Sequence, residues 1–95
     1  MKESFIKLLA NELRIIRIEN NDLQEDLAKK TGIAMSTISR YENGCNGMDI
    51  NKLEELLKPY NIDLINFFNR VLAKTQNKEV WLWKMMTQHQ LKTLF

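Results

Sequence analysis

The spacing of the apolar residues is the feature that most limits what this chain can fold into. Leucine, isoleucine, valine and phenylalanine recur at steps of three and four, which is the period of an α-helix with one buried face. No stretch alternates apolar and polar residues for long enough to predict a strand, and only one proline and three glycines interrupt the 95 residues. The sequence therefore predicts an all-α fold.

Capping residues and helix breakers divide this pattern into separate helices. The first expected helix covers residues 4–19 and ends at two asparagines, since asparagine tolerates the left-handed conformation that closes a helix. The second covers residues 22–30, with Asp22 as its cap, Glu25 reaching back to the first turn, and Gly32 at its end. Its exposed face is expected to carry two ion pairs at i,i+4 spacing, Glu25 with Lys29 and Asp26 with Lys30.

Further helices follow along the chain. The third is expected over residues 35–43. The fourth is capped by Asp49 and ends before Pro59, because proline cannot continue a helix. The fifth begins at Asp63, and a last helix is expected over residues 78–94.

The third expected helix has one face with almost no aliphatic side chains. Ile38 and Tyr41 lie three residues apart and can be buried together. The opposite face is formed by Met35, Ser36, Thr37, Ser39 and Arg40. Arginine can donate two hydrogen bonds to guanine, hydroxyl groups can bind bases or phosphates, and methionine can contact a thymine methyl group. A short helix of this kind, braced by the preceding one across a glycine turn, fits the major groove of DNA. The alternative is an ordinary solvated helix face.

Three stretches resemble a known family: QEDLA at residues 24–28, TGI at 31–33 and STISRYENG at 36–44. With their spacing kept, they resemble the Xre/Cro/C1-type helix-turn-helix family of phage and bacterial repressors over about residues 5–70. The resemblance implies a five-helix, lambda-repressor-like DNA-binding domain, here residues 1–73. In that fold the second and third helices read DNA, and the third lies in the major groove.

The resemblance also assigns roles to individual side chains. It places Met35, Ser36 and Arg40 against base edges. It places Gln24, Thr37, Ser39 and Asn43 on or near the DNA backbone. Arg17 and Glu42 are implied to form an ion pair inside the domain, which is a structural role.

Two positions depart from the family pattern. The family usually has serine or threonine where this chain has Ala34, and the missing helix cap is expected to cost about 1 kcal/mol. The family often has glutamine where this chain has Met35, so an apolar contact replaces a hydrogen bond to a base. Base recognition is therefore expected to depend on Ser36 and Arg40.

Residues 74–95 lie beyond such a domain, and we interpret them as a connector and a C-terminal helix. This segment carries more apolar surface than an exposed tail should. The side chains expected to form a dimer interface are Val80, Trp81, Trp83, Met86, Leu91 and Leu94. The alternative is that the helix folds back on its own domain.

Composition excludes several classes of site. A single cysteine, Cys45, cannot form an internal disulfide, and with a single histidine, His89, it cannot build a zinc site of usual spacing. No arrangement of side chains indicates catalysis, so neither an enzyme nor a cofactor is expected. No segment resembles a signal peptide or a membrane-spanning helix, which predicts a cytoplasmic protein. The net charge is only +2, so charge alone does not indicate a nucleic-acid partner.

The sequence is therefore interpreted as a homodimeric, sequence-specific transcriptional repressor of phage, plasmid or mobile-element type. Its expected partner is double-stranded DNA, contacted in the major groove at an inverted repeat. The alternative is an antitoxin-like protein that neutralises a partner protein through its C-terminal helix and regulates its own expression by binding DNA. A third hypothesis is an adaptor that uses the same fold to bind protein only.

Overall fold

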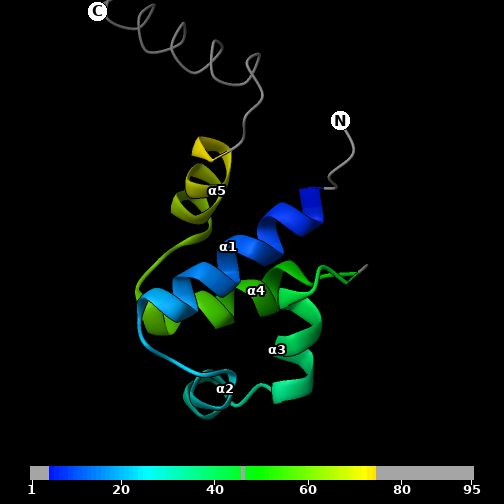
Figure 1. The fold of residues 1–95 in the computed structure, drawn as a ribbon, viewed down its shortest axis with the longest axis vertical. Helices are drawn as coiled ribbons and strands as arrows, with labels where there is room; N and C mark the ends of the chain where they lie inside the picture. The colour runs from blue at the N-terminus through cyan, green and yellow to red at the C-terminus, as the bar shows by residue number, and fades with distance from the viewer. Residues whose placement is uncertain (1–4, 46, 75–95) are drawn as a thin grey trace, which may run out of the picture.

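The computed structural model describes residues 5–45 and 47–74, and these residues form five α-helices and one short 3-10 helix. In chain order they are α1 (Phe5–Glu19), α2 (Gln24–Thr31), α3 (Met35–Glu42), α4 (Ile50–Leu57), η1 (Lys58–Tyr60) and α5 (Leu64–Ala73) (Figure 1). The predicted all-α fold is confirmed for this part of the chain. The helix expected over 78–94, with the interface residues assigned to it, lies outside the described residues.

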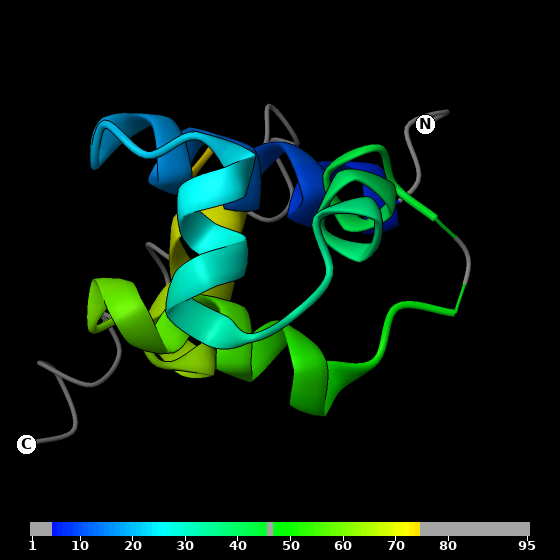
Figure 2. The ribbon, with the colours of Figure 1, turned by 90° about the horizontal axis from the view of Figure 1, so that it is seen from below.

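The core lies where the apolar faces of all five α-helices meet. Figure 2 shows α2 and α3 joined by a loop, with α1 along one side of the pair, α4 along the opposite side and α5 behind α2. The fully buried apolar side chains are Leu13, Ile16, Leu27, Ile38, Leu53, Leu56, Leu57 and Phe67. At least one comes from each α-helix, so no α-helix can leave this core without exposing apolar surface to water.

Most helix ends follow the local signals in the sequence. Gly32 closes α2 with a φ of +76°, a conformation that suits glycine. Asp49 caps α4 by accepting a hydrogen bond of 2.8 Å from the backbone N–H of Asn51. Asp63 caps α5 through the N–H of Asn66, also at 2.8 Å. α4 ends at Leu57, and the chain continues through Pro59 as the 3-10 helix η1.

The expected start of the second helix is wrong. α2 begins at Gln24, and Asp26, not Glu25, reaches back to the N-terminus by accepting a hydrogen bond of 2.8 Å from the Leu23 N–H. Asp22 lies outside the helix, where Lys30 Nζ donates to it at 2.6 Å. Glu25 and Lys29 do pair, at 3.7 Å, but Lys30 has Asp22 rather than Asp26 as its partner. Asp26 therefore takes the role expected of Glu25, and Asp22 pairs with Lys30 instead of capping the helix.

A buried carboxylate joins α1 to α5. Glu12 is only 2% exposed, and Arg70 Nε donates to its Oε2 at 2.7 Å while Lys74 Nζ lies 2.9 Å from its Oε1. Arg70 also reaches Glu19 on α1 at 2.9 Å. Burial alone would raise the pKa of Glu12, but the hydrogen bonds from Lys74 and Arg70 outweigh it and lower the pKa. These contacts fix the end of the described domain against α1.

Candidate nucleic-acid interface

α3 is a short helix that is held on one side and open on the other. Ile38 and Tyr41 are buried against the core, and Ile33 anchors the turn that precedes the helix. The Tyr41 hydroxyl accepts a hydrogen bond of 2.9 Å from the Asp49 N–H at the start of α4. α2 precedes α3 across the Gly32 turn and packs against it (Figure 2). The helix is therefore fixed while its outer face is left uncovered.

The side chains predicted to contact DNA lie on or next to this open face. Met35, Ser36, Arg40 and Asn43 are exposed, and Thr37 and Ser39 are half-buried. Met35 is 50% exposed, which is unusual for a large apolar side chain on an otherwise well-packed helix. Asn43 donates to the Ser39 carbonyl at 2.8 Å, so it is fixed at the end of α3.

The start of α3 lacks a side-chain cap. Ala34 occupies the cap position with φ −59° and ψ 141°, and no side-chain hydrogen bond satisfies the first turn. The Ala34 carbonyl nevertheless accepts the N–H groups of Thr37 at 3.0 Å and Ile38 at 3.1 Å. The departure noted in the sequence therefore leaves the helix intact but without the hydroxyl that would stabilise its N-terminus.

Glu42, at the end of α3, binds both α1 and α2. Arg17 Nε donates to Glu42 Oε2 at 2.7 Å and Arg17 Nη2 donates to Oε1 at 3.0 Å, so the ion pair that the resemblance implies is present and is bidentate. Gln24 Nε2 donates to the same Oε1 at 3.1 Å. The Glu42 hydrogen bond raises the pKa of Arg17 above its usual value, while burial acts in the opposite direction. Glu42 therefore positions α3 against the two helices before it.

The sequence did not predict the hydrogen bond between Gln24 and Glu42. Gln24 was expected to bond only a DNA phosphate, yet its amide nitrogen donates to Glu42, 18 residues away along the chain. An amide group carries two N–H donors, so this bond leaves one of them for a phosphate. The same carboxylate thus holds a side chain that is expected to contact DNA.

A second network orients the start of α2. Tyr60 Oη donates to Asp22 Oδ2 at 2.9 Å, and Arg17 Nη1 donates to the Asp22 carbonyl at 2.7 Å. The hydrogen bond from Lys30, followed by that from Tyr60, lowers the pKa of Asp22. Burial and the hydrogen bond to Asp22 raise the pKa of Tyr60. Tyr60 lies 38 residues from Asp22, so local patterns could not have predicted this contact.

Two properties of the described residues bear on other kinds of site. Within 5–45 and 47–74 there is no group of three or more histidine, cysteine, aspartate or glutamate side chains placed to hold a metal ion. In the same ranges, none of the helices has the length and apolar character needed to cross a membrane.

Two helices joined by a glycine turn, the second with its outer face uncovered, define a helix-turn-helix domain. The sequence pattern of the helix-turn-helix family matches residues 13–66, which is more than half of the 95 residues. The chain belongs to this family, in its Xre/Cro/C1 branch. The five-helix fold expected from the resemblance is therefore confirmed.

Curated relatives include two antitoxins. The chain is 32% identical over 56 residues to antitoxin HipB of Escherichia coli (strain K12) and of Escherichia coli O6:H1 (strain CFT073). The aligned part makes up 59% of this chain and 64% and 60% of those proteins, respectively. The chain therefore spans less than two thirds of the length of either relative.

Solved structures with a similar fold include a DNA-bound regulator. One of them is the restriction-modification controller protein C.Esp1396I, solved as a tetramer in complex with its natural 35 base-pair operator. It matches with a TM-score of 0.68 and 25% identity, and the match covers 76% of this chain and 95% of that chain. A mutant of the same controller matches with a TM-score of 0.68 and 26% identity, over 78% of this chain and 94% of that chain.

Proposed function

We propose that the chain is a sequence-specific DNA-binding transcriptional regulator that acts as a homodimeric repressor of phage, plasmid or mobile-element type. α3 enters the major groove, with Met35, Ser36 and Arg40 against base edges. The backbone contacts come from Gln24, Thr37, Ser39 and Asn43. Membership of the helix-turn-helix family and the likeness to an operator-bound controller protein support this proposal.

The single observation that carries the proposal is the contrast between the two faces of α3. Ile38 is fully buried, Tyr41 is 3% exposed, and Glu42 is paired with Arg17 inside the domain. Arg40, between them, is exposed and has no ion-pair partner among the described residues. Arginine is the side chain best suited to bidentate recognition of guanine, so a helix that buries its neighbours and exposes this one is suited to reading DNA.

We divide the chain into a DNA-binding domain, residues 1–73, and a dimerisation element, residues 74–95. Dimerisation suits a domain this small, because one recognition helix contacts few base pairs and binds weakly. Two copies bound about 34 Å apart, one turn of the DNA helix, read an inverted repeat. The cytoplasm is the compartment in which such a regulator meets DNA. Binding to DNA in this way needs neither a cofactor nor catalysis.

Selection of binding sites from random DNA tests the proposal directly. The purified chain should enrich a defined duplex, and two copies of one half-site in inverted orientation would establish base reading and dimer symmetry together. Recovery of no duplex above background, at low as well as moderate salt, would contradict sequence-specific DNA binding.

A second candidate function is that of an antitoxin, and the observation that favours it is the identity to the HipB antitoxins. In that case the chain binds and neutralises a partner protein through residues 77–95, and DNA binding regulates its own expression. Copurification separates the two functions. A stoichiometric protein partner that is lost when the chain is cut after residue 74 favours the antitoxin, whereas a full chain that purifies alone and binds an operator favours the repressor.

A further inference from the structure

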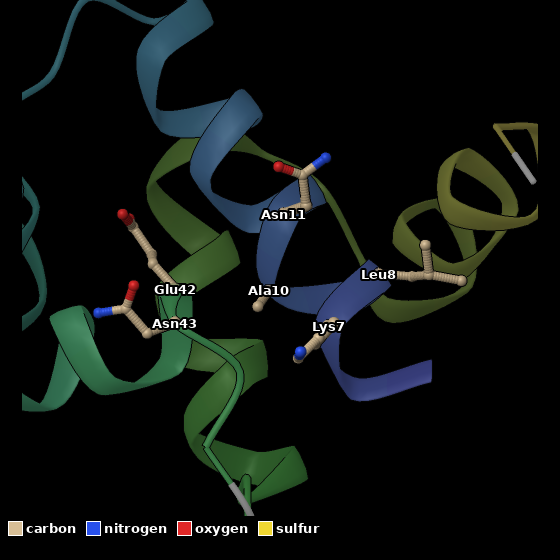
Figure 3. A pocket seen from close by; sticks show the side chains of 6 residues that line it. All are labelled: Lys7, Leu8, Ala10, Asn11, Glu42 and Asn43. Atoms are coloured by element: carbon tan, nitrogen blue, oxygen red, sulfur yellow. The ribbon is translucent and has the colours of Figure 1, made fainter. Parts of the chain in front are cut away.

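A hollow of about 290 Å³ lies where α1 passes the end of α3. Its polar lining comes from Lys7 and Asn11 on α1 and from Glu42 and Asn43 at the end of α3, as Figure 3 shows. Lys7 and Asn11 are four residues apart and therefore share one face of α1. Lys7, Asn11 and Asn43 are all exposed, so the hollow is open to a ligand from solvent.

The hollow joins the surface already proposed to contact DNA. Asn43, on one wall, is fixed by its hydrogen bond to the Ser39 carbonyl, and both residues are proposed backbone contacts. Glu42, on the same wall, accepts the hydrogen bond from Gln24, which is the proposed phosphate contact at the start of α2. A duplex that meets Gln24 and Asn43 therefore passes the mouth of the hollow.

Lys7 is held in place by the close passage of the two segments. A Cβ atom added to Gly44 would lie 3.2 Å from Lys7 Cγ and 3.5 Å from Lys7 Cα. Gly44 also has a φ of +77°, so glycine suits this position both for its conformation and for the closeness of α1. The aliphatic part of Lys7 thus packs over the turn that leaves α3, and its ammonium group is carried to the end of the recognition helix.

The segment after α3 carries no positive charge of its own with which to attract the DNA backbone. Between Arg40 and Lys52 the sequence contains no lysine or arginine, and it includes Asp49. The Glu42 carboxylate lines the hollow, but it is paired with Arg17 at 2.7 Å, so its charge is largely offset. Lys7, which is exposed on α1, brings a positive charge close to the turn after α3.

We propose, building on the proposed function, that this hollow receives a phosphate group of the DNA backbone. Lys7 supplies the positive charge, and the amides of Asn11 and Asn43 supply hydrogen-bond donors. α1 is then a third DNA-contacting element beside α2 and α3. Because a phosphate is the same at every base pair, this contact strengthens binding to all sequences equally.

The test measures how salt affects affinity for the duplex recovered by selection and for an unrelated duplex. Lys7→Gln keeps the methylene groups that cover Gly44 but removes the charge. The slope of log affinity against log salt should become shallower by about 0.9, the value for one phosphate contact, with equal weakening on both duplexes. Lys7→Arg should keep the slope of the natural chain. Lys58→Gln is the matched control, because Lys58 is exposed and lies at the end of α4 beside Pro59.

A second variant keeps the test decisive if Lys7→Gln changes folding. Asn11→Asp adds a negative charge to the hollow without changing its size, and it should weaken both duplexes equally. If Lys7→Gln and Asn11→Asp bind with the affinity and salt slope of the natural chain, the phosphate site is overturned while DNA binding stands. If the natural chain binds no duplex, the proposed function fails first, and the phosphate site fails with it.

Discussion

Gln24 and Glu42 are joined by a hydrogen bond of 3.1 Å from the amide nitrogen of α2 to the carboxylate at the end of α3. The same carboxylate accepts two hydrogen bonds from Arg17 on α1. One buried side chain therefore fixes the mutual position of the helices that form the proposed DNA-binding surface. Changes at Glu42 or Arg17 should affect folding first and DNA binding as a result.

Arg17→Gln should destabilise the domain strongly. The change leaves the Glu42 carboxylate, which is 8% exposed, without its cationic partner, and breaking a buried pair in this way typically costs about 3–5 kcal/mol. The free energy of unfolding, measured by urea denaturation, checks this value. Lys29→Gln is the control, because the Lys29–Glu25 pair is exposed at both ends and should contribute less than about 1 kcal/mol. Equal effects of the two changes would contradict a structural role for Arg17.

Glu12 should make the fold less stable in acid. Its pKa is lowered in the folded chain, so the carboxylate stabilises the fold above the ordinary carboxyl pKa of 4.5, and this stabilisation is lost as the pH falls through the lower, folded value. Glu12→Gln removes the titrating group together with its ion pairs to Arg70 and Lys74. The difference in unfolding free energy between the natural chain and this variant should therefore be largest near neutral pH and should shrink below about pH 4.5. A difference that stays constant with pH would contradict this assignment.

How far the sequence predicts this fold depends on the distance between the residues that make each contact. Gly32, Asp49 and Asp63 end or begin helices through backbone groups within a few residues, so their roles follow from local patterns. Asp22 was assigned to a helix cap from its spacing to Glu25, whereas its actual partner Tyr60 is 38 residues away and is placed by the packing of η1. Long-range side-chain partners require the assembled core and cannot be read from spacing.

In the candidate site too, local features follow from the sequence and long-range contacts do not. Exposure of Ser36 and Arg40 follows from the helical period once Ile38 and Tyr41 are placed in the core. Exposure of Met35 does not, because Met35 lies three residues before Ile38 and so near the same face of the helix. No local pattern in the sequence singles out Lys7 as a residue of the site. Its place beside α3 depends on how closely α1 passes Gly44, which is a property of the packed structure.

Arg40→Ala should change which DNA sequence is preferred. If Arg40 donates two hydrogen bonds to a guanine, its loss should cost about 1–3 kcal/mol at one operator position and relax the preference there. Binding to a panel of duplexes with single base-pair changes measures this effect. Folding should be unaffected, because the side chain is exposed. The same loss on every duplex would instead identify Arg40 as a phosphate contact.

Ala34→Thr should stabilise α3. A hydroxyl at this cap position can accept one of the unsatisfied N–H groups of the first turn, which is worth about 0.5–2 kcal/mol. In a domain of this size, a gain of 1 kcal/mol raises the melting temperature by about 4–8 °C. Ala34→Val is the matched control, since valine has nearly the same shape but no hydroxyl. A valine variant that melts as high as the threonine variant would show that capping is not the cause.

Removal of residues 75–95 should convert a dimer into a monomer. We expect the dimer interface to lie in the C-terminal segment, and the described domain contains a shared core with a part from every α-helix, so it should fold without that segment. Light scattering on the full chain and on residues 1–74 should give the masses of two copies and of one copy. The shorter chain should also bind the selected inverted repeat more weakly, because each recognition helix then binds alone. A monomeric full chain would exclude this dimer. A dimeric 1–74 chain would move the interface to the domain itself, where Ile65 on α5 is 72% exposed.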